Sequence, residues 1–330
     1  MILTMKTGRT IIVSLLLTVL TVLPASSQGY ALRRQATLVC HPDTTCPPEG
    51  FTLRVTPDSI IVGSSDADGR YYVLVTLQQM GDTLPCGTLA QQPRTHWRGL
   101  MLDSGRQYQQ VSTIKTLLDL MASLKMNIFH WHLSEDQGWR IEIKSYPRLT
   151  EVGAWRAGTQ IGKDWESCDS IPYGGFYTQD DIREIVEYAR HRHVTVIPEI
   201  EIPGHCRAIL RARPQLQCEN VSNRLDEVEE GYRRAVVCAG RDETLRFFEN
   251  VLDEVCELFD HPAYFDLGLA DETYEAQKYY QYVLVRGRIN YWKDVCAMCE
   301  ACEENGARPI VSGEYYYREP YLFKNNLPKN

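Results

Sequence analysis

From residue 97 onward, short apolar runs alternate with longer segments in which apolar residues recur every three or four positions. The apolar runs predict strands at 98–103, 127–133, 195–201 and 308–311, with another beginning at Tyr264. The periodic segments predict helices at 113–124, 178–190, 243–259 and 291–304. Repeated strand-then-helix units imply a parallel sheet with right-handed crossovers, and the expected fold class is therefore α/β.

A different pattern precedes residue 97. Strands are expected at 51–56 and 59–64, separated by a Pro-Asp turn, and a helix is expected at 67–80. Residues 28–48 have the composition of a loose lead-in, and 81–94 contain the glycine and proline of a linker. Residues 28–96 are therefore expected to form a small α+β domain in front of a larger β/α domain at 97–330.

The first 27 residues form a segment of their own. Lys6 and Arg9 precede an apolar run at 11–23, which is followed by Pro-Ala-Ser-Ser. These are the three parts of a secretory signal peptide, and the run is short for a membrane span. We expect an exported protein with no membrane span after cleavage, while an uncleaved N-terminal anchor is the alternative.

The composition is that of an ordinary globular protein, with 44% hydrophobic and 24% charged residues in a chain of 330. The formal net charge is −8, and removal of residues 1–27 takes away two further positive charges. An acidic exported protein is a poor candidate for binding nucleic acid or an anionic membrane. The charge favours a neutral or cationic substrate instead.

All 11 cysteines lie after residue 27, and this odd number leaves at least one thiol without an intrachain partner. Cys218 and Cys238 bracket a polar loop and are the better disulfide candidates. Cys296, Cys299 and Cys302 are spaced three residues apart on an expected helix. A tetrahedral zinc site needs a fourth ligand and usually a turn between ligand pairs, so these three are interpreted as small helix residues.

Polar and charged residues follow several of the expected strands. The run at 264–273 ends in two adjacent acids, Asp271 and Glu272, and two neighbouring carboxyl groups can divide acid and base work between them. Glu199 and Glu201 share one face of their strand, before a Pro-Gly turn that presents His205. Charge in a barrel strand costs free energy unless it is paired or functional, which favours a role in the site.

Two further patterns belong to the same region. His130 and His132 alternate around Trp131, so both imidazoles point to one face of the strand. They permit a metal site of the His-x-His kind, or alternatively one hydrogen-bonding and one packing histidine. The loop at 134–140 combines acids, an amide and an indole, which suits sugar hydroxyls and a sugar face better than a metal.

Four motifs follow one another along the chain. They are Arg98-Gly-Leu-Met-Leu-Asp103, His130-Trp-His-Leu-Ser-Glu-Asp-Gln-Gly-Trp-Arg140, Val196-Ile-Pro-Glu-Ile-Glu-Ile-Pro-Gly-His205, and Gly268 followed by Asp271-Glu272. In this order they resemble glycoside hydrolase family 20, the β-N-acetylhexosaminidases, from about Trp97 to the end. The unit at 49–80 resembles part of the small domain that precedes the barrel in that family. The resemblance implies a (β/α)8 TIM-type barrel, of which about five β/α units are visible here.

The resemblance also implies which residues bind the substrate. Arg98 would grip the hydroxyls of the terminal sugar, and Glu135 or Asp136, together with His132, would line the same pocket. The substrate would be an oligosaccharide or glycoconjugate that ends in β-linked N-acetylglucosamine or N-acetylgalactosamine.

The catalytic roles implied by the resemblance fall on four residues. Glu272 would be the general acid/base and Asp271 its partner, while Glu201 and His205 would support the acid. The family is an exception to the scheme with an enzymic nucleophile, because the 2-acetamido oxygen of the substrate attacks the anomeric carbon. Asp271 would orient the acetamide and stabilise the cationic intermediate. No metal or other cofactor is implied.

The chain departs from the family pattern in three respects. Asp266 stands where a histidine is usual, and two residues instead of one separate Gly268 from Asp271. Ser312 stands near a position where the family has a tryptophan, and Tyr315, Tyr316 or Tyr317 would compensate for the missing indole. The C-terminus at Asn330 leaves five strand units where a closed barrel has eight, so a truncated chain is expected.

These departures keep two alternatives open. The chain is either an active hydrolase or a catalytically inactive remnant that at most binds amino sugars. A third possibility is a metal-dependent barrel hydrolase that uses His130 and His132.

Overall fold

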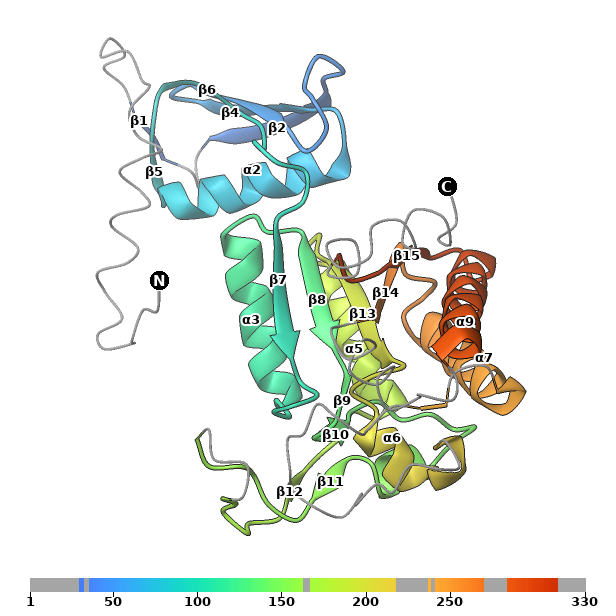
Figure 1. The fold of residues 1–330 in the computed structure, drawn as a ribbon. Coiled ribbons are helices and arrows are strands. Elements are labelled where there is room, and N and C mark those ends of the chain that lie inside the picture. The colour runs from blue at the N-terminus through green and yellow to red at the C-terminus, as the bar shows by residue number, and fades with distance from the viewer. Residues whose placement is uncertain are drawn as a thin grey trace. The chain divides into compact units, whose positions relative to one another are not determined.

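Two units make up the fold, Met1–His96 and Trp97–Asn330, and each is described by itself (Figure 1). The computed structural model describes residues 30–32, 36–162, 167–217, 237–238, 241–269 and 284–313, and of these only the backbone for 30–32 and 284–293.

The first unit contains a four-stranded sheet in the order β2-β4-β3-β6. Its elements are β2 (Thr37–Pro42), β3 (Phe51–Val55), β4 (Ser59–Ser64), α2 (Ala67–Met80) and β6 (Gly87–Gln91). A separate pair joins β1 (Tyr30–Leu32) to β5 (Thr83–Pro85). Apolar side chains of β3, β4 and α2 form its core.

The two central strands and the helix of this unit were predicted, but β2 and β6 were missed. The lead-in at 28–48 contains β2, and the expected linker contains β5 and β6. Both β2 and β6 lie at the edges of the sheet, and every residue of β2 is exposed. An edge strand that buries no face lacks the apolar alternation on which the prediction depended.

The second unit is built on a five-stranded, wholly parallel sheet in the order β15-β14-β13-β8-β7. All five strands predicted for this unit are present, at β7 (Gly99–Asp103), β8 (Ile128–His132), β13 (Thr195–Ile202), β14 (Tyr264–Gly268) and β15 (Arg308–Ile310). The strand order follows the chain order, as expected for successive right-handed β/α units.

Four long helices connect these strands and lie side by side in chain order (Figure 1). They are α3 (Val111–Ser123), α5 (Gln179–Arg190), α7 (Asp242–Leu258) and α9 (Leu284–Glu304). Helix α5 begins with the predicted capping box, in which Thr178 and Asp181 each accept from the other's backbone N–H. Helix α9 begins seven residues before the expected start at Tyr291.

The two faces of the sheet differ in chemistry because side chains alternate along a strand. On β8, Phe129 and Trp131 belong to the apolar core that the helices cover. The intervening His130 and His132 point to the opposite face, where acidic side chains of β13 and β14 contact them. The helices therefore bury one face of the sheet and leave the other for polar groups.

Short elements occupy the connections that leave the carboxyl ends of the strands. A hairpin of β9 (Ser134–Glu135) and β10 (Gly138–Trp139) follows β8, and α6 (Arg207–Ala212) with the 3-10 turn η1 (Pro214–Leu216) follows β13. Between β10 and α5 lie α4 (Arg148–Glu151), β11 (Trp155–Arg156) and β12 (Tyr173–Gly174).

Cys296, Cys299 and Cys302 lie on α9 as predicted, and none of the three is disulfide-bonded. Cys238 is disulfide-bonded, whereas Cys218 lies outside the described residues. The signal-peptide segment also lies outside them. Within the described part of the chain, no helix has the length and apolarity needed to cross a membrane.

Helix α3 offers a matched test of the packing. Leu118 is fully buried and Leu120 is 54% exposed on the same helix. Replacing Leu118 by alanine should lower the free energy of unfolding by about 2–5 kcal/mol, because it leaves a cavity in the core. Leu120→Ala should change it by no more than about 0.5 kcal/mol. Urea unfolding followed by tryptophan fluorescence measures both, and equal losses would contradict the assigned faces.

Candidate active site

Four polar side chains lie in one row across the second unit. Asp103 of β7 pairs in register with His132 of β8, which pairs with Glu199 of β13, which pairs with Asp266 of β14. Paired residues of neighbouring parallel strands point to the same face, so the four side chains line one face near the carboxyl ends of the strands. We call these four residues the polar row. Functional residues of β/α barrels occupy this end of the sheet.

Glu199 connects the members of the row. Its Oε2 atom lies 2.7 Å from Nε2 of His130 and 2.8 Å from Nδ1 of His132. The same nitrogen of His130 lies 3.4 Å from Oδ2 of Asp266. The other oxygen of Asp266 accepts a hydrogen bond of 2.8 Å from the backbone N–H of Gly268. One buried carboxylate thus joins two imidazoles and, through them, three strands.

A second set of contacts links the row to the loops. The guanidinium of Arg106 lies 2.6 Å from Asp103 and also forms an ion pair with Glu135. Glu135 in turn lies 2.7 Å from Nδ1 of His205. Asp136 lies 3.7 Å from the same nitrogen and accepts a hydrogen bond from the backbone N–H of Arg207. Side chains from three loops are therefore held together by alternating charge.

Glu201 lies directly over Gly268. Glu199 pairs with Asp266, and the next pair joins Ile202 to Gly268. Three residues of β13 thus lie opposite two of β14, which is a β-bulge. Gly268 has a φ of +67°, and a Cβ there would lie 2.1 Å from Oε2 of Glu201. Only glycine fits this position, both because of its backbone conformation and because of the carboxyl group above it.

Burial and neighbouring charges separate the pKa values of these acids. Burial opposes ionisation of Glu199, but hydrogen bonds from His130 and His132 outweigh it and lower its pKa to about 2. Burial, reinforced by the charge of Glu199, raises the pKa of Glu201 to about 8 and that of Asp266 to about 7. At neutral pH, Glu199 is therefore ionised, whereas Glu201 keeps its proton.

The histidines complement this pattern. Burial disfavours charge on His132, but the contact with Glu199 outweighs it and raises the pKa of His132 to about 9. The pKa of His130 is raised by Glu199 and Asp266 against the effect of burial. Both imidazoles thus compensate the charge of the buried carboxylate.

Two residues of the 134–140 loop have structural roles. Trp139 is fully buried and donates its indole N–H to the carbonyl of Ile141, so the indole is not available to a sugar face. Arg140 is also fully buried and donates to the carbonyls of Ser104, Gly105, Ala154 and Gly175. The loop therefore supplies Glu135 and Asp136 to the site, while Arg140 fastens the segments around it.

The structure places Arg98 away from the acids of the polar row. Its backbone precedes β7, its Nε donates to the carbonyl of Lys125, and its backbone N–H donates to Asn127. Asp103 lies five residues further along, about 16 Å away at the rise of an extended strand. Arg98 is thus at the amino end of the sheet, away from the acids. Arg106, three residues after Asp103, is the arginine that reaches them.

The other expected residues have different outcomes. His132, Glu135, Asp136, Glu201 and His205 are all buried near the carboxyl ends of the strands. Asp271 and Glu272 lie outside the described residues, as does Tyr315.

Sequence reasoning missed Asp103 and Arg106 and did not assign a role to Glu199 or Asp266. The signal for the first pair was present, because polar residues that directly follow an apolar strand mark the functional end of the sheet. For Glu199, the shared face with Glu201 was visible in the sequence. Its contact with both imidazoles was not.

Three groups of side chains place possible metal-ligand atoms within 4.8 Å of one another: His130 with Glu199 and Asp266, His132 with Glu199 and Glu201, and Glu135 with Asp136 and His205. Ligand atoms of a tetrahedral zinc ion, with bonds of about 2.0–2.1 Å, lie about 3.3 Å apart. The distances of 2.7 and 2.8 Å between Glu199 and the two imidazoles are instead those of charge-assisted hydrogen bonds. The spacing fits an ion-pair network better than a metal centre.

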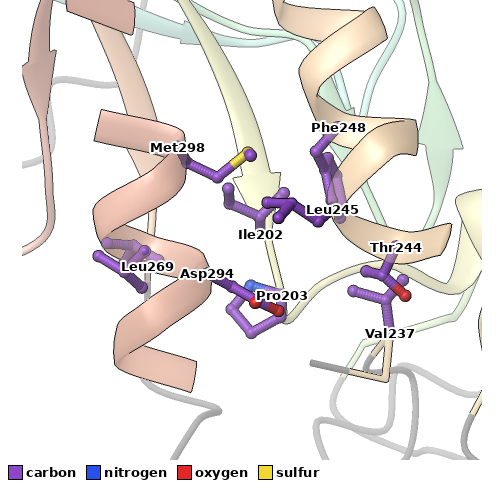
Figure 2. A pocket seen from close by; sticks show the side chains of 10 residues that line it. Ile202, Pro203, Val237, Thr244, Leu245, Phe248, Leu269, Asp294 and Met298 are labelled. Atoms are coloured by element: carbon purple, nitrogen blue, oxygen red, sulfur yellow. The ribbon is translucent and has the colours of Figure 1, made fainter. Parts of the chain in front are cut away.

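A separate pocket lies on the helical side of the sheet. Figure 2 shows side chains of α7, α9 and the end of β13 around it, and its empty volume is about 330 Å³. Its lining is almost entirely apolar and comprises Ile202, Pro203, Val237, Thr244, Leu245, Phe248, Leu269, Asp294, Val295 and Met298. No member of the polar row lines it, so it is distinct from the acidic site.

The raised pKa of Glu201 predicts that the stability of the fold depends on pH. Its pKa is raised from 4.5 to about 8 on folding, so only the folded state holds the proton between these values. Stability should therefore fall as pH rises through this range. Asp266 and His132 act in the same direction.

The variant Glu201→Gln should lose less stability than the wild type between about pH 5 and about pH 8, because its amide does not titrate. Urea unfolding at the two pH values measures this difference. An identical decrease in both proteins would show that Glu201 does not hold the proton.

Comparison with known proteins agrees with this arrangement. The family model for the glycosyl hydrolase family 20 catalytic domain matches residues 96–317. A β-hexosaminidase of Porphyromonas gingivalis is 42% identical over 68% of this chain and 30% of its own length. One from Vibrio furnissii is 38% identical over 72% of this chain and 40% of its own. The chain thus spans well under half the length of these relatives.

Solved structures give the same result. The β-N-acetylhexosaminidase of Bacteroides fragilis matches 88% of this chain and 56% of its own with a TM-score of 0.72 and 38% identity. An exo β-N-acetylglucosaminidase of Vibrio harveyi, solved with N-acetylglucosamine, matches 83% and 45% with a TM-score of 0.70 and 28% identity. These neighbours imply a TIM-type barrel domain, although the described strands do not close into a barrel. The chain belongs to glycosyl hydrolase family 20.

Proposed function

We propose that the protein is a glycoside hydrolase that removes terminal, non-reducing β-linked N-acetylhexosamine by a substrate-assisted retaining mechanism. The observation that carries this proposal is the convergence of acids and histidines at the carboxyl ends of four parallel strands in a family 20 chain. The names of the relatives support the same substrate class. A site with several acids also suits a neutral sugar.

The proposed chemistry divides between two sets of residues. Glu272 donates a proton to the leaving oxygen, and Asp271 orients the acetamide group, whose oxygen attacks the anomeric carbon. His132, Glu135 and Asp136 line the sugar pocket. This reaction requires no metal and no enzymic nucleophile.

Two residues support the acid from outside the reacting atoms. Glu201 and His205 are proposed to hold the position of Glu272, and both are buried beside the polar row. Arg106 takes the sugar-gripping role first expected for Arg98, since its side chain is 41% exposed while two carboxylates orient its guanidinium. A guanidinium fixed in this way can donate to vicinal hydroxyls.

We also propose that residues 1–27 direct export to the periplasm, the lumen of an organelle or the extracellular space. The basic start and the apolar run support this assignment. N-terminal sequencing of the exported protein would test it. A mature chain that still begins at Met1 would contradict cleavage.

The catalytic pair is tested by release of nitrophenol from a nitrophenyl N-acetyl-β-glucosaminide. The wild type should turn over, and chelators should not affect the rate. Glu272→Gln should lower the rate on unactivated glycosides by about 10²–10⁴-fold, because proton donation to the leaving group is lost. Asp271→Asn should slow every substrate that reacts through its acetamide.

Other results would select the alternatives. Binding of N-acetylglucosamine without turnover would favour an inactive amino-sugar-binding protein. Loss of activity on chelation would favour a metal-dependent hydrolase at His130 and His132.

The two arginines offer a matched comparison. Arg106→Ala should lower kcat/KM by about ten- to a hundred-fold, since hydrogen bonds from a charged donor are worth about 1.5–3 kcal/mol. Arg98→Ala should change it by less than about two-fold, because that side chain lies at the other end of the sheet. The reverse order of effects would restore the role first expected for Arg98.

A further inference from the structure

One ring nitrogen of His132 is without a partner. Both ring nitrogens are buried without a well-aligned hydrogen bond among the described residues, but Nδ1 has a 2.8 Å ion-pair contact with Glu199, whereas the described residues offer Nε2 no such contact. The residue as a whole is only 2% exposed. A buried polar atom left unpaired costs about 1–3 kcal/mol, and such atoms in native proteins usually pair with a ligand or an ordered water.

A second unpaired atom belongs to a side chain of the same cluster. Oε2 of Glu201 is also buried without a hydrogen-bond partner among the described residues. One side-chain N or O atom from each of His132, Glu199 and Glu201 lies within 4.8 Å of the others, so the three side chains form one cluster. The two side chains therefore each leave a polar atom of this cluster for a ligand or an ordered water to pair with.

The orientation of His132 depends on Glu199. That carboxylate is itself held from the other side by His130, which lies 2.7 Å away and whose side chain is 26% exposed. Further charged groups face the cluster from the neighbouring strands, Asp103 from β7 and Asp266 from β14. Within this set, Glu199 is the acid that contacts the His132 ring directly.

We propose that Glu199 is a positioning residue of the site, which holds His132 through Nδ1 so that its Nε2–H is a standing donor to the amino sugar. This inference rests on the proposed function for the identity of the ligand. Glu199 itself does not touch the sugar. It acts by fixing the ring and by keeping the proton on Nε2.

The electrostatics agree with the geometry. The contact with Glu199 raises the pKa of His132 to about 9 despite burial. Without the carboxylate, burial would be the main remaining effect and would favour the neutral ring. A neutral imidazole keeps only one N–H, and nothing would then direct that proton to Nε2.

Histidine NMR tests the positioning directly and needs no ligand. The chain has eight histidines, and His132→Gln identifies the His132 ring signals by their disappearance. In the full-length wild type, His132 should stay protonated through neutral pH. In Glu199→Gln, it should titrate at least about two pH units lower, because burial is no longer opposed by the carboxylate. An unchanged titration would overturn the proposal.

The affinity for N-acetylglucosamine tests the consequence. Glu199→Gln should bind this sugar about ten-fold more weakly than the wild type near neutral pH, as expected for loss of a charged donor. The deficit should shrink at about pH 5, where the variant's His132 regains its proton. A deficit of the same size at both pH values would indicate a general structural defect and would contradict the positioning role.

A surface pair serves as the matched control. Glu187 lies 2.8 Å from Nε2 of His191, the same separation as in the buried pair, but His191 is 72% exposed. Glu187→Gln should leave both the His132 titration and the sugar affinity unchanged.

A second variant keeps the test decisive if Glu199→Gln does not fold. His132→Gln places an amide N–H near the position of Nε2 and cannot titrate. It should weaken sugar binding by the same factor at both pH values, and unaltered affinity would overturn the proposal. If the wild type binds no N-acetylglucosamine, the proposed function fails, while the NMR comparison still decides the role of Glu199.

Discussion

The site is organised around the need to compensate the negative charge of one buried carboxylate, Glu199. Glu199 is 6% exposed, and ionisation at such a position is tolerated only when opposite charge lies in contact with it. His130 and His132 supply that charge from the neighbouring strand. Removing one partner of such a buried pair leaves the other uncompensated, so the three side chains form one unit.

This compensation is possible because the two faces of the sheet are separated. Helices cover the face that carries Phe129 and Trp131, and the alternation along β8 sends the two histidines to the opposite face. Parallel pairing then aligns Asp103, His132 and Glu199 in one row. The same apolar packing that stabilises the unit therefore also brings the polar groups together.

The loops extend the polar row through contacts in which basic and acidic side chains alternate. Arg106 contacts Asp103 on the strand and Glu135 on the hairpin, and Glu135 contacts His205 beyond β13. Arg140 fastens the surrounding segments through their carbonyl groups and contributes no charge to the chain of contacts. A single motif thus divides into residues that line the site and residues that hold its shape.

Several features were predictable because they depend on neighbours in the chain. The strands of the second unit, the capping box at Thr178 and the shared face of His130 and His132 all follow from local periodicity. The position of Arg98 at the amino end of β7 was not predictable, because a motif shows which residue types occur together but not at which end of a strand each one lies. The edge strand β2 was missed because it buries no face that would impose a pattern.

By itself, the sequence determined the order of the five parallel strands and four long helices of the second unit, the polar faces of β8 and β13, and the family to which the motifs belong. These properties depend on the pattern of apolar and polar residues within a few positions along the chain. Only the tertiary structure decided the register that aligns His132 with Glu199 and the contact between Arg106 and Glu135. It also decided which carboxyl groups keep their protons. Register, burial and charge separation depend on strands that are distant in the chain, so they exist only once the sheet has formed.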